Sequence, residues 1–164
     1  MINNLIILSV LFHISSFQLK EGDLLFQDID CGPLCDAIEQ VTTGIDEAKF
    51  SHIGFVVERS GELYVLEAIS AGVVFTPVDD FLKRSLDMDG NPKILVGRLK
   101  EPYRKLIPDA IAFASNFEGE VYDTVYSMSN DAWYCSELIY QSFKSASGFD
   151  LFEPTPMTFK SPGT

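Results

Sequence analysis

The sequence predicts one α+β domain in which an antiparallel sheet packs against helices. The first hundred residues hold short β-branched and aromatic runs separated by turn residues, whereas later segments repeat apolar residues at helical spacing. Strands first and helices second along the chain are typical of α+β domains. With 164 residues, 46% of them hydrophobic, the chain is long enough to bury one core.

Five segments account for the expected strands. The clearest are residues 51–57 and 63–69, which flank a polar turn over 58–62 and predict a hairpin. The others, each rich in strand-forming residues, are 21–27 with its leading turn, 72–77 and 93–99. Strands that follow one another so closely predict antiparallel pairing.

Helical patterns follow the strands. Pro108 suits a first helical turn, and apolar spacing continues to Gly119, which ends the helix. A second helix is predicted over residues 134–144, with one apolar stripe formed by Cys135, Leu138, Ile139 and Phe143. Shorter or looser elements are a helix over 34–42, a helix-compatible link over 79–87 and a proline-rich loop over 154–163 that lies on the domain.

The N-terminal segment predicts export. An apolar run over residues 5–12 is too short to span a bilayer, but it suits a signal peptide and precedes the small residues Ser15 and Ser16. We therefore expect a signal peptide over 1–17 and a mature domain over 18–164, in the periplasm, the cell envelope or the medium. The absence of Lys and Arg before the run leaves open an ordinary buried N-terminal element and a cytoplasmic protein.

The net charge of −12 bears on partners. A strongly acidic surface repels phosphate backbones and anionic membrane faces, so a nucleic-acid partner is not expected. No stable membrane span is expected either, because no apolar run is long enough. The charge is mainly a statement about solubility, and neither a substrate nor an oligomeric state follows from it.

Three cysteines cannot all pair within one chain, so at least one thiol is free or pairs between chains. Cys31 and Cys35 lie four residues apart and could form a disulfide, half a metal site or two small residues that begin a helix. We expect the last, because no second cysteine pair and only one histidine outside the leader could complete a zinc shell. No metal and no other cofactor is predicted.

Cys135 is the candidate nucleophile. It falls in the first turn of a helix, where unpaired N–H groups and the helix dipole lower a thiol pKa. Its own backbone N–H would point toward an oxyanion formed during acyl transfer. A buried structural cysteine is the alternative for this helix taken by itself.

His52 and Glu67 are the candidate base and its partner. If the hairpin turn is centred on Ser60-Gly61, paired residue numbers sum to 121, so His52 lies opposite Ile69 with Glu67 as its diagonal neighbour. Both side chains then point to one face, where a long glutamate reaches the ring. A turn one residue longer or shorter would put Glu67 on the other face, as a solvent-facing residue.

Several motifs together resemble the permuted papain-like amidases of the YiiX and YaeF group, within the wider NlpC-type superfamily. The resemblance covers about residues 20–145 and includes His52 ahead of Cys135, the reverse of the order in ordinary papain-like enzymes. The motifs are Gly22-Asp23-Leu24-Leu25-Phe26-Gln27, Ser51-His52-Ile53-Gly54-Phe55, Leu66-Glu67-Ala68, Tyr122-Asp123 and Tyr134-Cys135-Ser136-Glu137-Leu138.

This resemblance implies a small antiparallel sheet or partial barrel packed against helices. It further implies Cys135 as nucleophile, His52 as base and then acid, and Glu67 as the group that orients His52. Tyr134 and Gln27 are weaker candidates for substrate binding or for an oxyanion donor.

The function expected from these residues is hydrolysis of an amide bond, in a cell-wall peptide or an amino-acid amide, through an acyl-enzyme. A lipid-directed acyl hydrolase or acyltransferase is an alternative, although we expect no apolar docking segment apart from the leader. A non-catalytic binding domain on the same fold is the third possibility. The expected partner is thus a small-molecule, peptide or acyl substrate.

Overall fold

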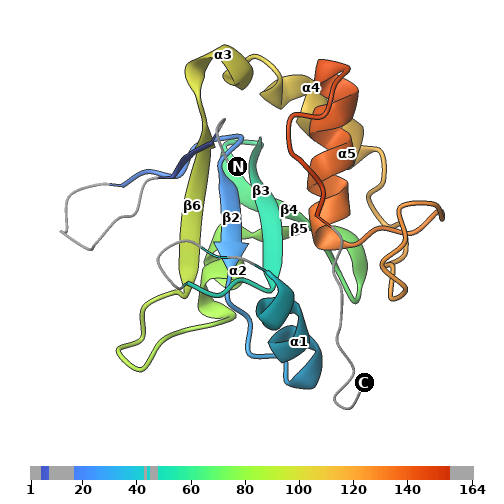
Figure 1. Ribbon diagram of the computed structural model, residues 1–164. Coiled ribbons are helices and arrows are strands. Elements are labelled where there is room, and N and C mark those ends of the chain that lie inside the picture. The colour runs from blue at the N-terminus through green and yellow to red at the C-terminus, as the bar shows by residue number, and fades with distance from the viewer. Residues whose placement is uncertain (1–4, 8–16, 43, 45–47, 156–164) are drawn as a thin grey trace.

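The computed structural model describes residues 5–7, 17–42, 44 and 48–155 (Figure 1). Its strands are β1 (Leu5–Ile7), β2 (Leu24–Gln27), β3 (His52–Arg59), β4 (Glu62–Ile69), β5 (Gly72–Pro77) and β6 (Ile94–Leu99). Its helices are α1 (Pro33–Val41), α2 (Val78–Lys83), α3 (Glu101–Arg104), α4 (Ile107–Ser115) and α5 (Cys135–Ser147). The predicted α+β class is confirmed.

The strands form one open sheet in the order β1-β6-β2-β3-β4-β5, and every neighbouring pair is antiparallel. Figure 1 shows β6, β2 and β3 side by side, with α1 at the end of the sheet where β2 finishes. Of the two predicted forms, the structure therefore has the sheet and not the partial barrel.

The β3–β4 hairpin has the predicted register. Phe55 lies opposite Leu66 and Arg59 opposite Glu62, so paired numbers sum to 121. The turn residues Ser60 and Gly61 have φ of 56° and 83°, the left-handed pair that matches strand twist in a two-residue hairpin. The ladder ends at Phe55, so the expected pairing of His52 with Ile69 is not part of it.

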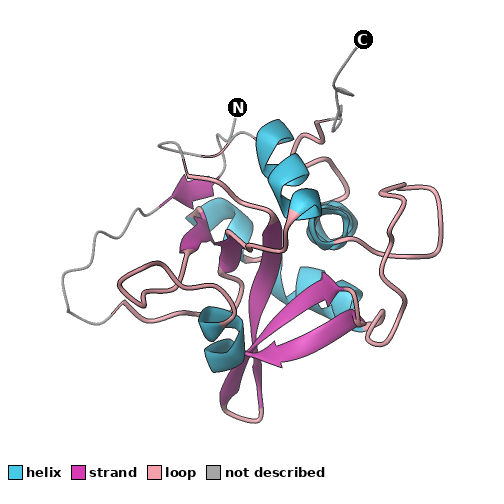
Figure 2. Cartoon of the chain, turned by 90° about the horizontal axis from the view of Figure 1, so that it is seen from below, coloured by secondary structure: helices cyan, strands magenta, loops and turns pink. Residues whose placement is uncertain are grey.

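Strand alternation divides the buried side chains between two faces. Helices α4 and α5 cover one face, and α2 covers the other (Figures 1 and 2). Adjacent residues on one strand therefore enter different cores: Leu24, Val57 and Leu66 pack with α5, whereas Leu25, Val56 and Val65 pack around Phe81 of α2. This division decides which helix can reach which end of the site.

The remaining boundaries are close to those predicted. Helix α5 begins at Cys135, as expected for a nucleophile in the first turn, and it ends at Ser147 before Gly148. Regular hydrogen bonding in α4 stops at Ser115, and turns carry the chain to Gly119. The predicted tail loop over 154–163 lies mostly outside the described residues.

The N-terminal strand β1 pairs with β6 at one edge of the sheet. The rest of the predicted signal peptide, apart from Phe17, lies outside the described residues, so export stays a prediction. Within the described ranges, no helix has the length and apolar character needed to cross a membrane.

Candidate active site

The first contact in the site joins two neighbouring strands. His52 at the start of β3 donates from Nε2 to Oε2 of Glu67 on β4, at 2.5 Å. His52 is 8% exposed and Glu67 is fully buried. The side chains therefore meet on one face, as the hairpin register predicts.

The third member of this group comes from the opposite side of the sheet. Cys135 is the first residue of α5, and its thiol is hydrogen-bonded to His52. Because Nε2 of His52 is already hydrogen-bonded to Glu67, Nδ1 is the ring nitrogen that can bond to the sulfur. His52 can reach both partners because it lies at the strand end, where the β3–β4 ladder has stopped.

The surroundings of Cys135 favour the thiolate. Burial alone raises the pKa of the thiol, but the hydrogen bond and charge of His52 lower it below the usual value, helped by the N–H groups of Ile53 and Ser136. The sulfur thus has three donors directed at it. The residue is nevertheless partly exposed, which a nucleophile requires.

His52 is held in its protonated form. Burial lowers its pKa, but hydrogen bonds to Cys135 and Glu67 outweigh burial and raise the pKa to about 9. The ring therefore carries a positive charge between a sulfur and a carboxylate at neutral pH.

The Glu67 carboxylate is fully occupied by neighbours. Arg84 donates to Oε2 at 2.9 Å and to Oε1 at 2.5 Å, and Thr76 donates to Oε1 at 2.5 Å. Burial raises the pKa of Glu67, but Arg84, His52 and Thr76 lower it to about 2. A buried carboxylate with contacts on both oxygens keeps one orientation, and so does the imidazole bound to it.

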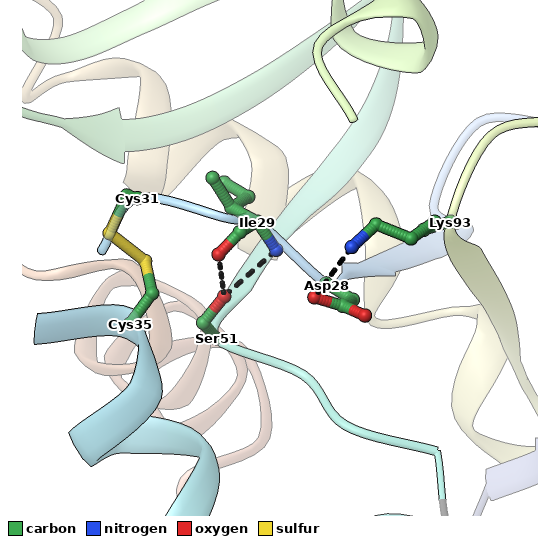
Figure 3. Close-up of a disulfide and its surroundings, with 6 residues drawn as sticks. All are labelled: Asp28, Ile29, Cys31, Cys35, Ser51 and Lys93. Atoms are coloured by element: carbon green, nitrogen blue, oxygen red, sulfur yellow. Dashed lines mark hydrogen bonds and ion pairs between the residues drawn. A yellow bond between two sulfur atoms is a disulfide. The ribbon is translucent and has the colours of Figure 1, made fainter. Parts of the chain in front are cut away.

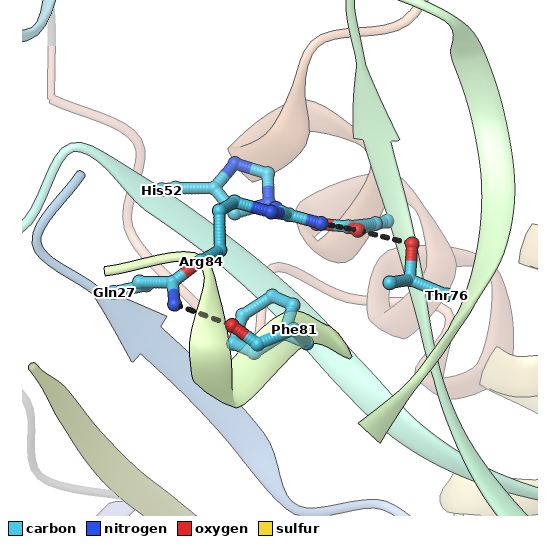
Figure 4. A network of polar contacts seen from close by, with 6 residues as sticks. Gln27, His52, Thr76, Phe81 and Arg84 are labelled. Carbon is cyan, nitrogen blue, oxygen red and sulfur yellow. Dashed lines mark hydrogen bonds and ion pairs between the residues drawn. The ribbon is translucent and has the colours of Figure 1, made fainter. Parts of the chain in front are cut away.

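Helix α2 supports this pair from below the ring. Phe81 lies 6.0 Å from the His52 ring, and the Arg84 guanidinium lies 5.0 Å from the Phe81 ring (Figure 4). Nε2 of Gln27 donates a hydrogen bond to the Phe81 carbonyl oxygen at 2.8 Å, so strand β2 is also joined to α2. Gln27 pairs directly with His52 in the β2–β3 register.

This arrangement changes the interpretation of Gln27. Its Nε2 is bound to the Phe81 carbonyl, and the atom left without a partner in the described chain is Oε1, which is an acceptor. Gln27 also belongs to the sheet face covered by α2, away from the body of α5. The geometry therefore favours a supporting role for Gln27 over that of an oxyanion donor.

Tyr134 is placed next to the thiol by the chain itself. It is the residue that precedes α5, is 7% exposed and lies 5.4 Å from the Tyr126 ring. Burial and the nearby charges of Glu137 and Cys135 raise its pKa to about 12, so its hydroxyl stays protonated. Most of the Tyr134 surface is packed against neighbours, and its role in substrate binding or as an oxyanion donor stays a prediction.

Comparison with known proteins assigns the family. The model of the permuted papain-like amidase enzymes, YaeF/YiiX, C92 family, matches residues 18–161. The chain belongs to this family. It is 32% identical over 158 residues to "Uncharacterized protein YiiX" of Escherichia coli strain K12, which covers 92% of this chain and 71% of that protein.

A solved structure agrees with the assignment. The crystal structure of "metalloprotein yiiX" from Escherichia coli O157:H7 matches with a TM-score of 0.62 at 26% identity, over 82% of this chain and 69% of that chain. The fold is therefore that of the permuted papain-like amidase family.

The candidate site of this chain contains two residues that the sequence did not point to. Thr76 could have been found by the same diagonal rule that selected Glu67, because β5 pairs Val74 with Glu67 and places Thr76 two residues further on that face. Arg84 follows the short helix α2, and no strand or helix periodicity connects it with Glu67. Only the packing of α2 on the sheet brings the two charges together.

The cysteine prediction was wrong in one respect. Cys31 and Cys35 form a disulfide with Cα atoms 5.4 Å apart, and are not two unlinked residues at the start of α1 (Figure 3). The preceding Ile29 exchanges hydrogen bonds with Ser51, the neighbour of His52, at 3.0 and 3.3 Å. Cys135 is consequently the single free thiol of the protein.

Proposed function

We propose that this protein is a cysteine amidase in which Cys135 is the nucleophile, His52 the base and then the acid, and Glu67 the group that orients His52. The family is one of amidase enzymes, which supports the reaction class. The observation that carries the residue roles is the hydrogen-bonded series from Cys135 through His52 to Glu67. A nucleophile, a base and an orienting group in contact are the requirements of covalent acyl transfer.

In the proposed reaction His52 first takes the thiol proton of Cys135, and the thiolate then attacks the amide carbonyl carbon, so that a C–S bond forms and the oxygen becomes negative. The N–H groups at the start of α5 stabilise that oxygen. The C–N bond then breaks as protonated His52 gives its proton to the leaving amine. His52 next takes a proton from water, which attacks the thioester, breaks the C–S bond and releases the carboxylic acid.

The proposed reaction is written without a metal ion. The solved YiiX relative is described as a metalloprotein. Here, however, both oxygens of Glu67 accept hydrogen bonds from protein donors. Nε2 of His52 is one of these donors, so it is not available to a metal ion. Within the described residues, no group of three or more His, Cys, Asp or Glu side chains could hold a metal ion. The donor set of this site therefore does not fit a metal centre.

For the substrate we propose an amide in a cell-wall peptide or an amino-acid amide, consistent with the predicted export. A second candidate is a fatty acyl group, and an unexpected observation favours it. The segment that leads to α5 along the chain exposes three apolar side chains: Val121 at 64%, Val125 at 76% and Met128 at 44%. Exposed apolar side chains on the chain that leads to the nucleophile suit contact with an acyl chain.

The experiment that tests the function compares wild type with Cys135→Ala. Each protein is incubated with muropeptides, phospholipids and acyl thioesters, and the products are identified by mass spectrometry. We expect Cys135→Ala to lose turnover entirely while its circular dichroism and melting temperature stay those of the folded protein. The matched control, Cys31→Ser with Cys35→Ser, retains turnover because that disulfide does not touch the reacting groups.

Hydrolysis of a verified substrate by Cys135→Ala would overturn the proposal. A wild-type Cys135 that reacts with iodoacetamide no faster in the folded than in the unfolded protein would instead favour a non-catalytic binding domain.

A further inference from the structure

Glu137 is a buried acid that the proposed reaction does not use. It lies in the first turn of α5, two residues after Cys135, and is 3% exposed. Its carboxylate accepts the backbone N–H of Tyr134, which is the return half of a capping box. The other oxygen, Oε2, has no hydrogen-bond partner in the described part of the chain.

The neighbours of Glu137 do not compensate a negative charge. Asp123, 1% exposed, faces it from the preceding loop, with its own oxygens accepting the N–H groups of Val125 at 2.7 Å and Ser127 at 2.6 Å. The other titratable groups near this helix end are Tyr134 and Cys135 of the same segment, Tyr122 and Tyr126 of the preceding loop, and His52 of β3 beyond the sulfur.

These surroundings make Glu137 change its charge near neutral pH. Burial and the nearby Asp123 raise the pKa of Glu137 to about 7, although the Tyr134 N–H opposes them. A proton can bind to Oε2 without breaking a hydrogen bond, because this oxygen has no partner in the described part of the chain.

We propose that Glu137 is a positioning residue that supports acyl transfer by Cys135 only while it is protonated, and that its ionisation acts as a brake on formation of the acyl-enzyme. Neutral Glu137 caps the first turn and leaves the helix end positive. Ionised Glu137 adds a negative charge at the same helix end where the carbonyl oxygen becomes negative. The inference rests on the proposed function, because it concerns the oxyanion made by Cys135.

Two reagents separate the oxyanion from the thiolate. p-Nitrophenyl acetate acylates Cys135 through a tetrahedral oxyanion, whereas iodoacetamide alkylates the sulfur without one. We expect the wild-type acylation rate to fall roughly three- to tenfold as pH rises through about 7, the effect of a charge in the first helical turn. The alkylation rate should show no such fall.

The decisive variant is Glu137→Gln, because glutamine keeps the capping contact but cannot ionise. Its acylation rate should stay high until His52 loses its proton near pH 9. Glu120→Gln, an exposed change in the segment before α5, should behave like wild type. Asp123→Asn should move the fall to lower pH, because one negative neighbour of Glu137 is gone. Melting temperatures show whether each variant is folded.

The outcomes distinguish the two proposals. If Glu137→Gln follows the wild-type acylation profile, or Asp123→Asn leaves the position of the fall unchanged, the role of Glu137 is wrong while fast alkylation of Cys135 still supports the proposed function. If Cys135 reacts with neither reagent in the folded protein, the proposed function fails, and this inference fails with it.

Discussion

At the scale of single residues, the site depends on how Glu67 is held. A buried carboxylate is costly unless its oxygens are paired, and here His52, Thr76 and Arg84 together occupy both oxygens. The ion pair with Arg84 keeps Glu67 charged, and charged Glu67 in turn keeps His52 protonated beside Cys135. The pKa values of the three groups are thus consequences of one contact network.

This network predicts how the free energy of unfolding depends on pH. The lowered pKa of Glu67 stabilises the fold above its ordinary value of 4.5, and that stabilisation is lost as pH falls toward about 2. The raised pKa of His52 stabilises the fold below 6.5, and that contribution is lost as pH rises toward about 9. Urea unfolding measured from about pH 3 to about pH 10 should show the largest free energy of unfolding between about pH 4.5 and about pH 6.5, where both contributions are present.

The substitution Glu67→Gln tests whether Glu67 causes the loss of stability at acidic pH. Removing the charge leaves Arg84 and His52 without their partner, so we expect a loss of about 3–5 kcal/mol in the free energy of unfolding and a flatter acid limb. Glu62→Gln, at the exposed start of the same strand, should change neither. An acid limb that is unchanged in Glu67→Gln would show that another carboxylate governs it.

At the scale of elements, α1 and α2 have different parts in the site. Helix α2 contributes Phe81 and the following Arg84, which contact the His52–Glu67 pair directly. Helix α1 is connected to the site by the chain before it, where Ile29 is hydrogen-bonded to Ser51. The disulfide at its first turn should therefore affect stability more than chemistry.

Replacing Cys31 and Cys35 by serine should lower the free energy of unfolding by about 2 kcal/mol or less, because the disulfide closes a very short loop. Urea unfolding of wild type with and without dithiothreitol measures the same effect. Intact mass after iodoacetamide treatment of the unfolded protein should show one modified cysteine before reduction and all three after it. Three modified cysteines without reduction would contradict the disulfide.

At the scale of the whole molecule, the acidic charge dominates. A net charge of −12 produces repulsion within the folded protein, and salt screens that repulsion. Exposed ion pairs such as Arg59 with Glu118 stabilise the fold only slightly, so their screening costs little stability. We expect the melting temperature to rise by about 2–5 °C as sodium chloride increases from about 10 to about 150 mM. A neutral osmolyte at equal osmolality is the control, and a falling melting temperature would contradict the expectation.

The sequence by itself determined the features that depend on local periodicity. The hairpin register follows from the Ser60-Gly61 turn, and side-chain parity then places His52 and Glu67 on one face. The start of α5 at Cys135 follows from helical spacing in the same way. These relations hold between residues joined by a turn or by one helix, so neighbours along the chain carry all the information needed.

The tertiary structure decided what depends on elements meeting in space. It joined Arg84 to Glu67 by packing α2 on the sheet, and it brought Cys135 to His52 across 83 positions of sequence (135 − 52). It also buried Glu137 within reach of the charge of Asp123, which no spacing rule indicates. Desolvation and the approach of distant charges set these contacts, and both arise only when the two layers of helices close on the sheet.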